Sequence, residues 1–191
     1  MDKFTITGGN PLNGEVIPGG NKNAALPLLA ACLLTEEPVI LRNVPDIQDV
    51  NIMGKLIKSL GIDIEVLEPN VWKIHARHIR PTDLDPDLCR KIRASILLAG
   101  PLVAKVGELH LPPPGGDVIG RRRVDTHLLA LEKLGAKVTY DRAFHFEAHG
   151  LTGADILLDE ASVTATENAI MASVLAKGTS VIRNAASEPH I

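Results

Sequence analysis

The chain has 191 residues, and its 45% hydrophobic and 23% charged residues are typical of a folded globular protein rather than a disordered one. Its 20 basic and 23 acidic side chains give a formal net charge of −3, and aromatic residues make up only 3%. Because nucleic-acid binding relies on positive charge and aromatic stacking, we expect no nucleic-acid partner.

The hydrophobic pattern predicts three successive groups of elements. The first contains, in chain order, helix 22–35, strand 38–42, helix 46–60, strand 62–66 and strand 71–76. The second repeats this order with helix 87–106, strand 108–111, helix 125–134, strand 136–140 and strand 143–148. The third begins with strand 154–158, helix 165–177 and strand 179–184, and the sequence stops there.

Two sequence echoes support an internal repeat. Gly61 and Gly135 each follow a leucine at the end of a predicted helix. Residues 40–44 resemble residues 181–185, and these two segments lie about twice as far apart in the sequence as the two glycines do. Both echoes fit a unit of about 70 residues. We therefore predict repeats at about 12–80, 81–152 and 153–191, the third of them incomplete.

The first helix of each unit is apolar nearly all round and rich in small residues, which is typical of a buried helix. The second helices carry charges on one side. This contrast predicts an α/β fold with helices inside and sheets outside, the reverse of a doubly wound sheet.

The sequence does not favour a membrane-spanning, secreted or metal-binding protein. The longest apolar run, residues 24–34, is too short to span a bilayer, and the N-terminus does not resemble a secretory signal. Cys32 and Cys89 do not have metal-ligand spacing, and neither do the seven histidines. We therefore expect a cytoplasmic protein with reduced cysteines, no metal, no cofactor and no membrane partner.

Lys22 and Arg93 are candidate anion-binding residues. Gly19, Gly20 and Asn21 form a turn that delivers Lys22 and Asn23 to the start of a predicted buried helix, where free backbone amides would add to the ammonium charge. Arg93 occupies the matching position of the second unit. The simpler alternatives are a solvated lysine beside a turn and an arginine in a surface salt bridge.

A second candidate is the loop over residues 111–125. Prolines stiffen its stem, glycines free its tip, and Asp117 is followed by three consecutive arginines at 121–123. This composition is typical of a closing loop that binds phosphate and carries a proton donor. The alternative is a flexible basic hairpin with a salt-bridged aspartate.

A third candidate is the start of the helix predicted after residue 161. Thr164 and Glu167 have the spacing of a capping box, which needs no functional explanation. Backbone amides at Ser162 and Val163 could still hold a polar ligand.

Ordered blocks along the whole chain resemble the enolpyruvyl transferases, and among them the branch that acts on a UDP-sugar. These blocks are GGNKNAALP, NVPDIQDV, RASILLAGPLVA, PGGDVIGRRRVDTH, LEKLGAKV, SVTATENAIMA and NAASEP. The LGNAGTA-type motif of the sister branch, which acts on shikimate 3-phosphate, does not occur in the sequence.

The resemblance implies transfer of the enolpyruvyl group of phosphoenolpyruvate to the 3-hydroxyl of UDP-N-acetylglucosamine, a step of peptidoglycan synthesis. It also implies an inside-out α/β barrel of βαβαββ-type repeats in each of two domains. The implied catalytic residues are Asp117 as proton donor, Lys22 and Arg122. The implied substrate-binding residues are Lys22, Asn23, Arg93, Arg122, Arg123, Val124, Asp125, Thr126, Ser162 and Val163.

The sequence departs from the family pattern at three positions. Asp117 replaces the usual loop cysteine, Arg123 replaces a usual proline, and Gln48 replaces a frequent lysine. A carboxyl group can donate a proton at neutral pH only if enclosure raises its pKa from the ordinary value of about 4. Since Asp117 lacks the sulfur that fosfomycin-type epoxides alkylate, we expect insensitivity to such drugs.

The family is about twice as long as this chain. By the resemblance, residues 1–21 are the opening strand segment of a missing second domain, and residues 22–191 are an incomplete first domain. The missing C-terminal domain would supply an aspartate base and further arginines, so we expect the fragment to be inactive alone and to self-associate. The alternatives are a non-catalytic, half-length paralogue that binds a nucleotide sugar, and a shikimate-3-phosphate enolpyruvyl transferase.

Overall fold

The computed structural model describes residues 3–80, 84–116 and 123–191. The helices are α1 (Lys22–Ala31), α2 (Gln48–Ser59), α3 (Pro86–Lys91), α4 (Ala99–Lys105), α5 (Asp125–Lys133) and α6 (Val163–Val174), with 3-10 helices η1 (Cys32–Leu34) and η2 (Arg93–Leu98). The strands are β1 (Val39–Leu41), β2 (Asp63–Glu68), β3 (Val71–His75), β4 (Glu108–Leu111), β5 (Lys137–Tyr140), β6 (Phe144–Glu147), β7 (Asp155–Leu157) and β8 (Val181–Arg183). Among these described residues, no helix combines the length and apolar character needed to cross a bilayer.

Two three-stranded sheets share one topology. The first has the order β1-β3-β2 and the second has the order β4-β6-β5, and the middle strand is antiparallel to both neighbours in each. In the last part of the chain, β7 and β8 pair in parallel on either side of α6 in the sequence. The first two groups of elements predicted from the sequence therefore fold in the same way.

The sequence echoes also share backbone conformations. Asn43 after β1 and Asn184 after β8 both adopt a left-handed conformation, with φ of 58° and 57°. Gly61 and Gly135 end α2 and α5 with φ of 80° and 103°, a region that glycine adopts without strain.

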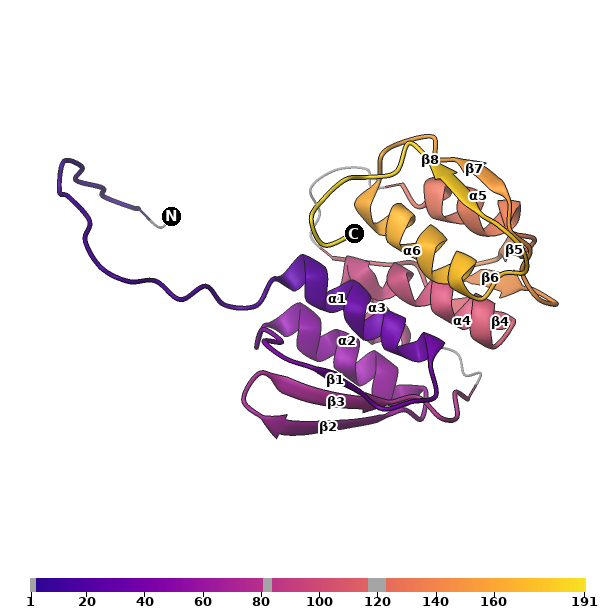
Figure 1. Cartoon of the computed structure of the whole chain (residues 1–191), viewed down its shortest axis with the longest axis horizontal. Coiled ribbons are helices and arrows are strands. Elements are labelled where there is room, and N and C mark those ends of the chain that lie inside the picture. The colour runs from indigo at the N-terminus through magenta and orange to yellow at the C-terminus, as the bar shows by residue number, and fades with distance from the viewer. Residues whose placement is uncertain (1–2, 81–83, 117–122) are drawn as a thin grey trace.

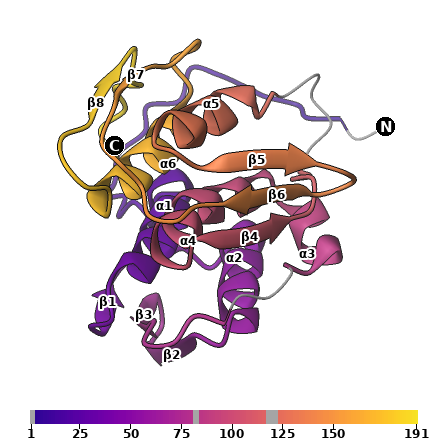
Figure 2. The same ribbon diagram turned by 90° about the vertical axis from the view of Figure 1, so that its right-hand side faces the viewer.

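The helices that begin each group lie in the interior. α1, η2 with α4, and α6 contact one another, and α2 lies between α1 and the first sheet (Figure 1). A quarter-turn view shows the sheet of β4, β5 and β6 on the outside of these helices (Figure 2). Small residues allow the close packing, since a side-chain carbon at Gly100 of α4 would lie 2.7 Å from the backbone oxygen of Asn168 in α6.

The predicted helix 87–106 is wrong as a single element. Ile92 adopts an extended conformation, with φ −134° and ψ 135°, and separates α3 from η2 and α4. Ile92 is 1% exposed, so this extended residue is itself part of the core. The break places Arg93 at the start of a new helical segment.

Residues 3–20 form no helix or strand and extend away from the rest of the chain (Figure 1). Their large apolar side chains are almost fully exposed, with Phe4 at 90% and Leu12 at 99%. The assignment of residues 1–21 to another domain, like the repeat boundaries, stays a prediction.

Candidate functional site

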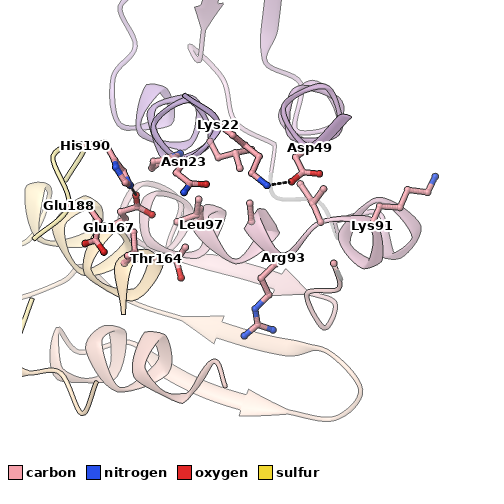
Figure 3. Close-up of a pocket in the computed structure, with 16 residues that line it drawn as sticks. Lys22, Asn23, Asp49, Lys91, Arg93, Leu97, Thr164, Glu167, Glu188 and His190 are labelled. Atoms are coloured by element: carbon pink, nitrogen blue, oxygen red, sulfur yellow. Dashed lines mark hydrogen bonds and ion pairs between the residues drawn. The ribbon is translucent and has the colours of Figure 1, made fainter. Parts of the chain in front are cut away.

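A cavity of about 330 Å³ lies where three helical segments begin. It is lined by the starts of α1, η2 and α6, by Gly116, and by residues near the end of the chain. Four of the predicted substrate-binding residues line it together, namely Lys22, Asn23, Arg93 and Val163. Figure 3 shows Lys22 with Asp49 on one side of the cavity and Glu167, Glu188 and His190 on the other.

Lys22 is paired with a residue that the sequence did not single out. Its Nζ lies 3.1 Å from Oδ2 of Asp49 in α2, and both side chains are partly exposed to the cavity. The pairing leaves further ammonium hydrogens for a ligand, because a lysine has three donors. Asp49 therefore offsets part of the positive charge that Lys22 brings to the cavity.

The expectation of free backbone amides at the start of α1 is wrong. The side chain of Asn21 accepts hydrogen bonds from the amides of Asn23 and Ala24, at 2.8 and 3.3 Å. Asparagine is a preferred N-cap residue, and here it satisfies the donors that an anion would otherwise use. An anion at this helix would therefore be held by side chains such as Lys22 rather than by these two amides.

Arg93 connects the cavity to the loop over residues 111–125, called the glycine-rich loop below. Its Nη2 donates a hydrogen bond of 2.7 Å to the backbone oxygen of Arg123. On the other side of the loop, the amides of Gly115 and Gly116 donate to the carbonyl oxygens of Cys89 and Arg90, at 3.0 and 3.1 Å. Asp117 and Arg122 lie outside the described residues, so the roles predicted for them stay predictions.

The side chains of Arg123 and Thr126, which follow the loop, contact carboxylates outside the cavity lining. Arg123 pairs with Asp125 at 2.7 Å and with Asp159 at 3.3 Å, and these carboxylates raise the pKa of its guanidinium. Thr126 donates to Asp159 at 2.5 Å, and Val124 precedes α5. Of these residues only Arg123 is shown to contact Arg93, through its backbone oxygen, and none of them is among the described residues that line the cavity.

The capping box predicted for Thr164 and Glu167 is wrong. The N-cap of α6 is Ser162, whose Oγ accepts a hydrogen bond from the Ala165 amide at 3.3 Å. Thr164 already lies inside the helix, where its hydroxyl contacts His127 at 3.1 Å. Glu167 turns toward the end of the chain instead of back to the cap.

Glu167 and His190 form a buried pair at the edge of the cavity. Their carboxyl and imidazole groups lie 3.7 Å apart, and only 6% of the Glu167 side chain is exposed. Burial, together with the charge of Glu188, raises the pKa of Glu167 from 4.5 to about 7. The sequence did hold a signal for this residue, because Glu167 is the only charged residue of α6.

The arrangement suits an anionic or oxygen-rich ligand. Three cationic residues, Lys22, Lys91 and Arg93, line the cavity together with three carboxyl groups and several neutral donors. Over residues 3–80, 84–116 and 123–191, no group of histidine, cysteine and acidic side chains could hold a metal ion.

Comparison with known proteins places the chain in a family. Residues 6–191 match the family model for EPSP synthase (3-phosphoshikimate 1-carboxyvinyltransferase). The chain belongs to this enolpyruvyl transferase family. The resemblance stated from the sequence blocks is therefore confirmed.

Curated relatives are similar over the whole chain. The UDP-N-acetylglucosamine 1-carboxyvinyltransferase of Bradyrhizobium diazoefficiens is 59% identical over 189 residues, covering 99% of this chain and 44% of the relative. The protein of the same name from Treponema denticola is 58% identical over 191 residues, covering 100% of this chain and 45% of the relative. The chain thus spans somewhat less than half the length of the curated relatives it matches.

Solved structures of enolpyruvyl transferases share the fold. The enolpyruvyl transferase NikO from Streptomyces tendae has a TM-score of 0.79 at 23% identity, covering 96% of this chain and 43% of that one. EPSP synthase from Acinetobacter baumannii has a TM-score of 0.74 at 17% identity, covering 93% and 42%. The α/β enolpyruvyl transferase fold predicted from the sequence is confirmed.

Proposed function

We propose that this chain is part of a cytoplasmic enzyme that transfers the enolpyruvyl group of phosphoenolpyruvate to the 3-hydroxyl of UDP-N-acetylglucosamine and releases phosphate. The 59% identity to a protein named for this reaction is the observation that carries the proposal. The cavity supports it, since Lys22 and Arg93 offer positive charge at one place to a strongly anionic donor. The product would be a precursor of peptidoglycan and so of the cell wall.

The reaction needs an acid and a phosphate-binding wall. The sugar hydroxyl adds to C2 of phosphoenolpyruvate while C3 takes up a proton, which gives a tetrahedral adduct. Loss of phosphate from C2 and of a proton from C3 then restores the double bond. Lys22 and Arg93 would stabilise negative charge on the donor throughout, and Asp117 would supply the proton to C3.

The loop residues complete the proposal. Asp117 and Arg122 belong to the segment between Gly116 and Arg123, both of which the structure places beside Arg93. Arg122 would bind the departing phosphate. The nucleotide would contact the residues predicted for it, which are Arg123, Val124, Asp125, Thr126, Ser162 and Val163.

The second wall of the site would come from the part of the relatives beyond the matched region. We infer that this part completes the third repeat of an inside-out barrel and supplies a second domain. Large apolar side chains on α1 and α6 support this inference, since Leu28 is 51% and Val174 62% exposed. Because such patches associate, we also infer that the isolated chain self-associates, which light scattering over a range of concentrations would test.

The direct test is release of phosphate from phosphoenolpyruvate. The chain is assayed alone and joined to the part of the Treponema denticola relative that follows the matched region. We expect release only from the joined form, only with UDP-N-acetylglucosamine, and its loss in the variant Asp117→Asn. Release with shikimate 3-phosphate instead would favour the sister activity, and nucleotide-sugar binding without release would favour a non-catalytic binding protein.

A further inference from the structure

A chain of hydrogen bonds runs from the core to the cavity and begins at Asn168. This α6 side chain is fully buried. Its Oδ1 accepts from the Gly100 amide at 2.8 Å, and its Nδ2 donates to the Ile96 carbonyl at 2.9 Å. Because a backbone amide can only donate and a carbonyl can only accept, these two partners fix the orientation of the Asn168 amide.

The orientation of Asn168 determines the tautomer of His127. The second hydrogen on Asn168 Nδ2 points to His127 Nδ1, 2.8 Å away, so Nδ1 must accept and carries no proton. Burial and the charge of Arg93 lower the pKa of His127 to about 3, which keeps the ring neutral. A neutral ring with a bare Nδ1 carries its proton on Nε2.

The tautomer of His127 in turn fixes the role of Thr164. Nε2 lies 3.1 Å from the Thr164 hydroxyl, so the ring donates and the hydroxyl oxygen accepts. The hydroxyl hydrogen then needs another acceptor, and no described residue accepts a hydrogen bond from it. Thr164 lines the cavity that also holds Arg93 and Lys22 (Figure 3).

We propose that Thr164 is a substrate-contacting residue whose hydroxyl donates a hydrogen bond to a neutral acceptor oxygen of the nucleotide sugar, and that His127 and Asn168 act through it as positioning residues. This inference rests on the proposed function. A neutral donor matches the hydroxyl and amide oxygens of the sugar and the carbonyl oxygens of uracil. The ionised oxygens of phosphoenolpyruvate are better served by Lys22 and Arg93.

The buried chain of hydrogen bonds explains why the Thr164 hydroxyl is oriented before a ligand binds. Each group from Gly100 to His127 has its partner, so the direction of every hydrogen in the chain is determined before a ligand arrives. A hydroxyl free to rotate would lose entropy on binding, whereas Thr164 loses less because His127 already occupies one side of its oxygen.

The test compares Thr164→Val with Thr164→Ser in the joined enzyme described above. Valine keeps the shape and removes the hydroxyl, whereas serine keeps the hydroxyl. We expect Thr164→Val to raise KM for UDP-N-acetylglucosamine about threefold to tenfold, the usual worth of one neutral hydrogen bond, with kcat and KM for phosphoenolpyruvate little changed. Thr164→Ser should restore most of the affinity.

Histidine variants test the positioning role. In His127→Gln the side-chain amide can still donate to Thr164, whereas in His127→Asn the shorter side chain cannot reach it. We expect the glutamine variant to have the lower KM for the nucleotide sugar. Nitrogen NMR of the unmutated chain tests the same point without substitution, and it should show His127 protonated at Nε2 and bare at Nδ1.

The outcomes separate this inference from the proposed function. If the joined wild-type enzyme releases no phosphate with UDP-N-acetylglucosamine, the proposed function fails and the inference fails with it. If that enzyme is active but Thr164→Val leaves KM for the nucleotide sugar unchanged, or raises only KM for phosphoenolpyruvate, the inference alone is overturned. A proton on Nδ1 of His127 would also overturn it.

Discussion

The Arg93 guanidinium donates to the backbone oxygen of Arg123 at 2.7 Å and so holds the end of the glycine-rich loop against the start of η2. Gly116 approaches the same residue, since a side-chain carbon there would lie 3.0 Å from the Arg93 amide nitrogen. Two points of the 111–125 loop, Gly116 and Arg123, therefore lie against one arginine, and that arginine lines the cavity.

The first prediction concerns the two functions of Arg93. Arg93→Ala should raise KM for the substrates of the joined enzyme by about tenfold or more, because it removes a charged donor from the cavity and releases the Arg123 backbone. Steady-state kinetics measure the change. Arg90→Ala is the matched control, since Arg90 is exposed and paired with Asp87 at 2.6 Å. Equal effects of the two substitutions would contradict the role given to Arg93.

The second prediction concerns the approach of the loop to α3. A side-chain carbon at Gly115 would lie 1.7 Å from the Arg90 carbonyl oxygen, a distance that no backbone can accept unmoved. Gly115→Ala should therefore lower the free energy of unfolding by about 2 kcal/mol, as overpacking does elsewhere. Urea denaturation measures this. Gly19→Ala, where a side-chain carbon meets nothing within 4 Å, should change stability little.

The third prediction is a pH dependence caused by Glu167. In the unfolded chain this carboxyl loses its proton near its ordinary pKa of 4.5, whereas in the folded chain the pKa is about 7. Between these values the unfolded state binds fewer protons, so this group makes stability fall as pH rises, and the fall ends above the folded pKa.

Unfolding measured at about pH 5 and about pH 8 tests this sign. The stability difference between the Glu167→Gln variant and the wild type should grow in favour of the variant at the higher pH. Glu132→Gln serves as control, because Glu132 is exposed on α5. A Glu167→Gln variant with the same pH profile as the wild type would show that the carboxyl is not buried in this way.

The fourth prediction concerns epoxide antibiotics of the fosfomycin type. Asp117 replaces the usual cysteine, and burial raises the pKa of both Cys32 and Cys89 to about 11, so neither supplies a thiolate at neutral pH. Incubation with fosfomycin should leave the intact mass of the chain unchanged. The variant Asp117→Cys should gain a covalent adduct. An adduct on the wild-type chain would contradict the predicted insensitivity.

Local patterns predicted the positions of Lys22 and Arg93 because both depend on short-range features. Turn residues before α1 mark the helix start at Lys22, and the repeat matches Arg93 to that position, but the helix start at Arg93 comes from the break at Ile92, which the pattern did not predict. The pairing of Lys22 with Asp49 could not be predicted in this way. It depends on how α1 packs against α2, which no periodicity encodes.

Two local predictions failed because another side chain caps the start of the helix. Thr164 and Glu167 fit a capping box, but Ser162 lies two positions earlier and caps α6 first. The amides at the start of α1 were expected to be free, but Asn21 is itself a strong N-cap. In both cases the competing side chain was visible in the sequence, and only the observed helix boundary decided between them.

Binding of UDP-N-acetylglucosamine to the joined enzyme, followed residue by residue by NMR, tests the central claim most directly. If the starts of α1, η2 and α6 form one substrate-binding wall, the amide signals of Asn23, Ala94 and Val163 should shift together with a single dissociation constant. The amide signal of Gly150 should not shift, because this residue follows β6 and does not line the cavity. Saturating nucleotide sugar that moves none of the three signals, or moves them with different dissociation constants, would contradict the claim.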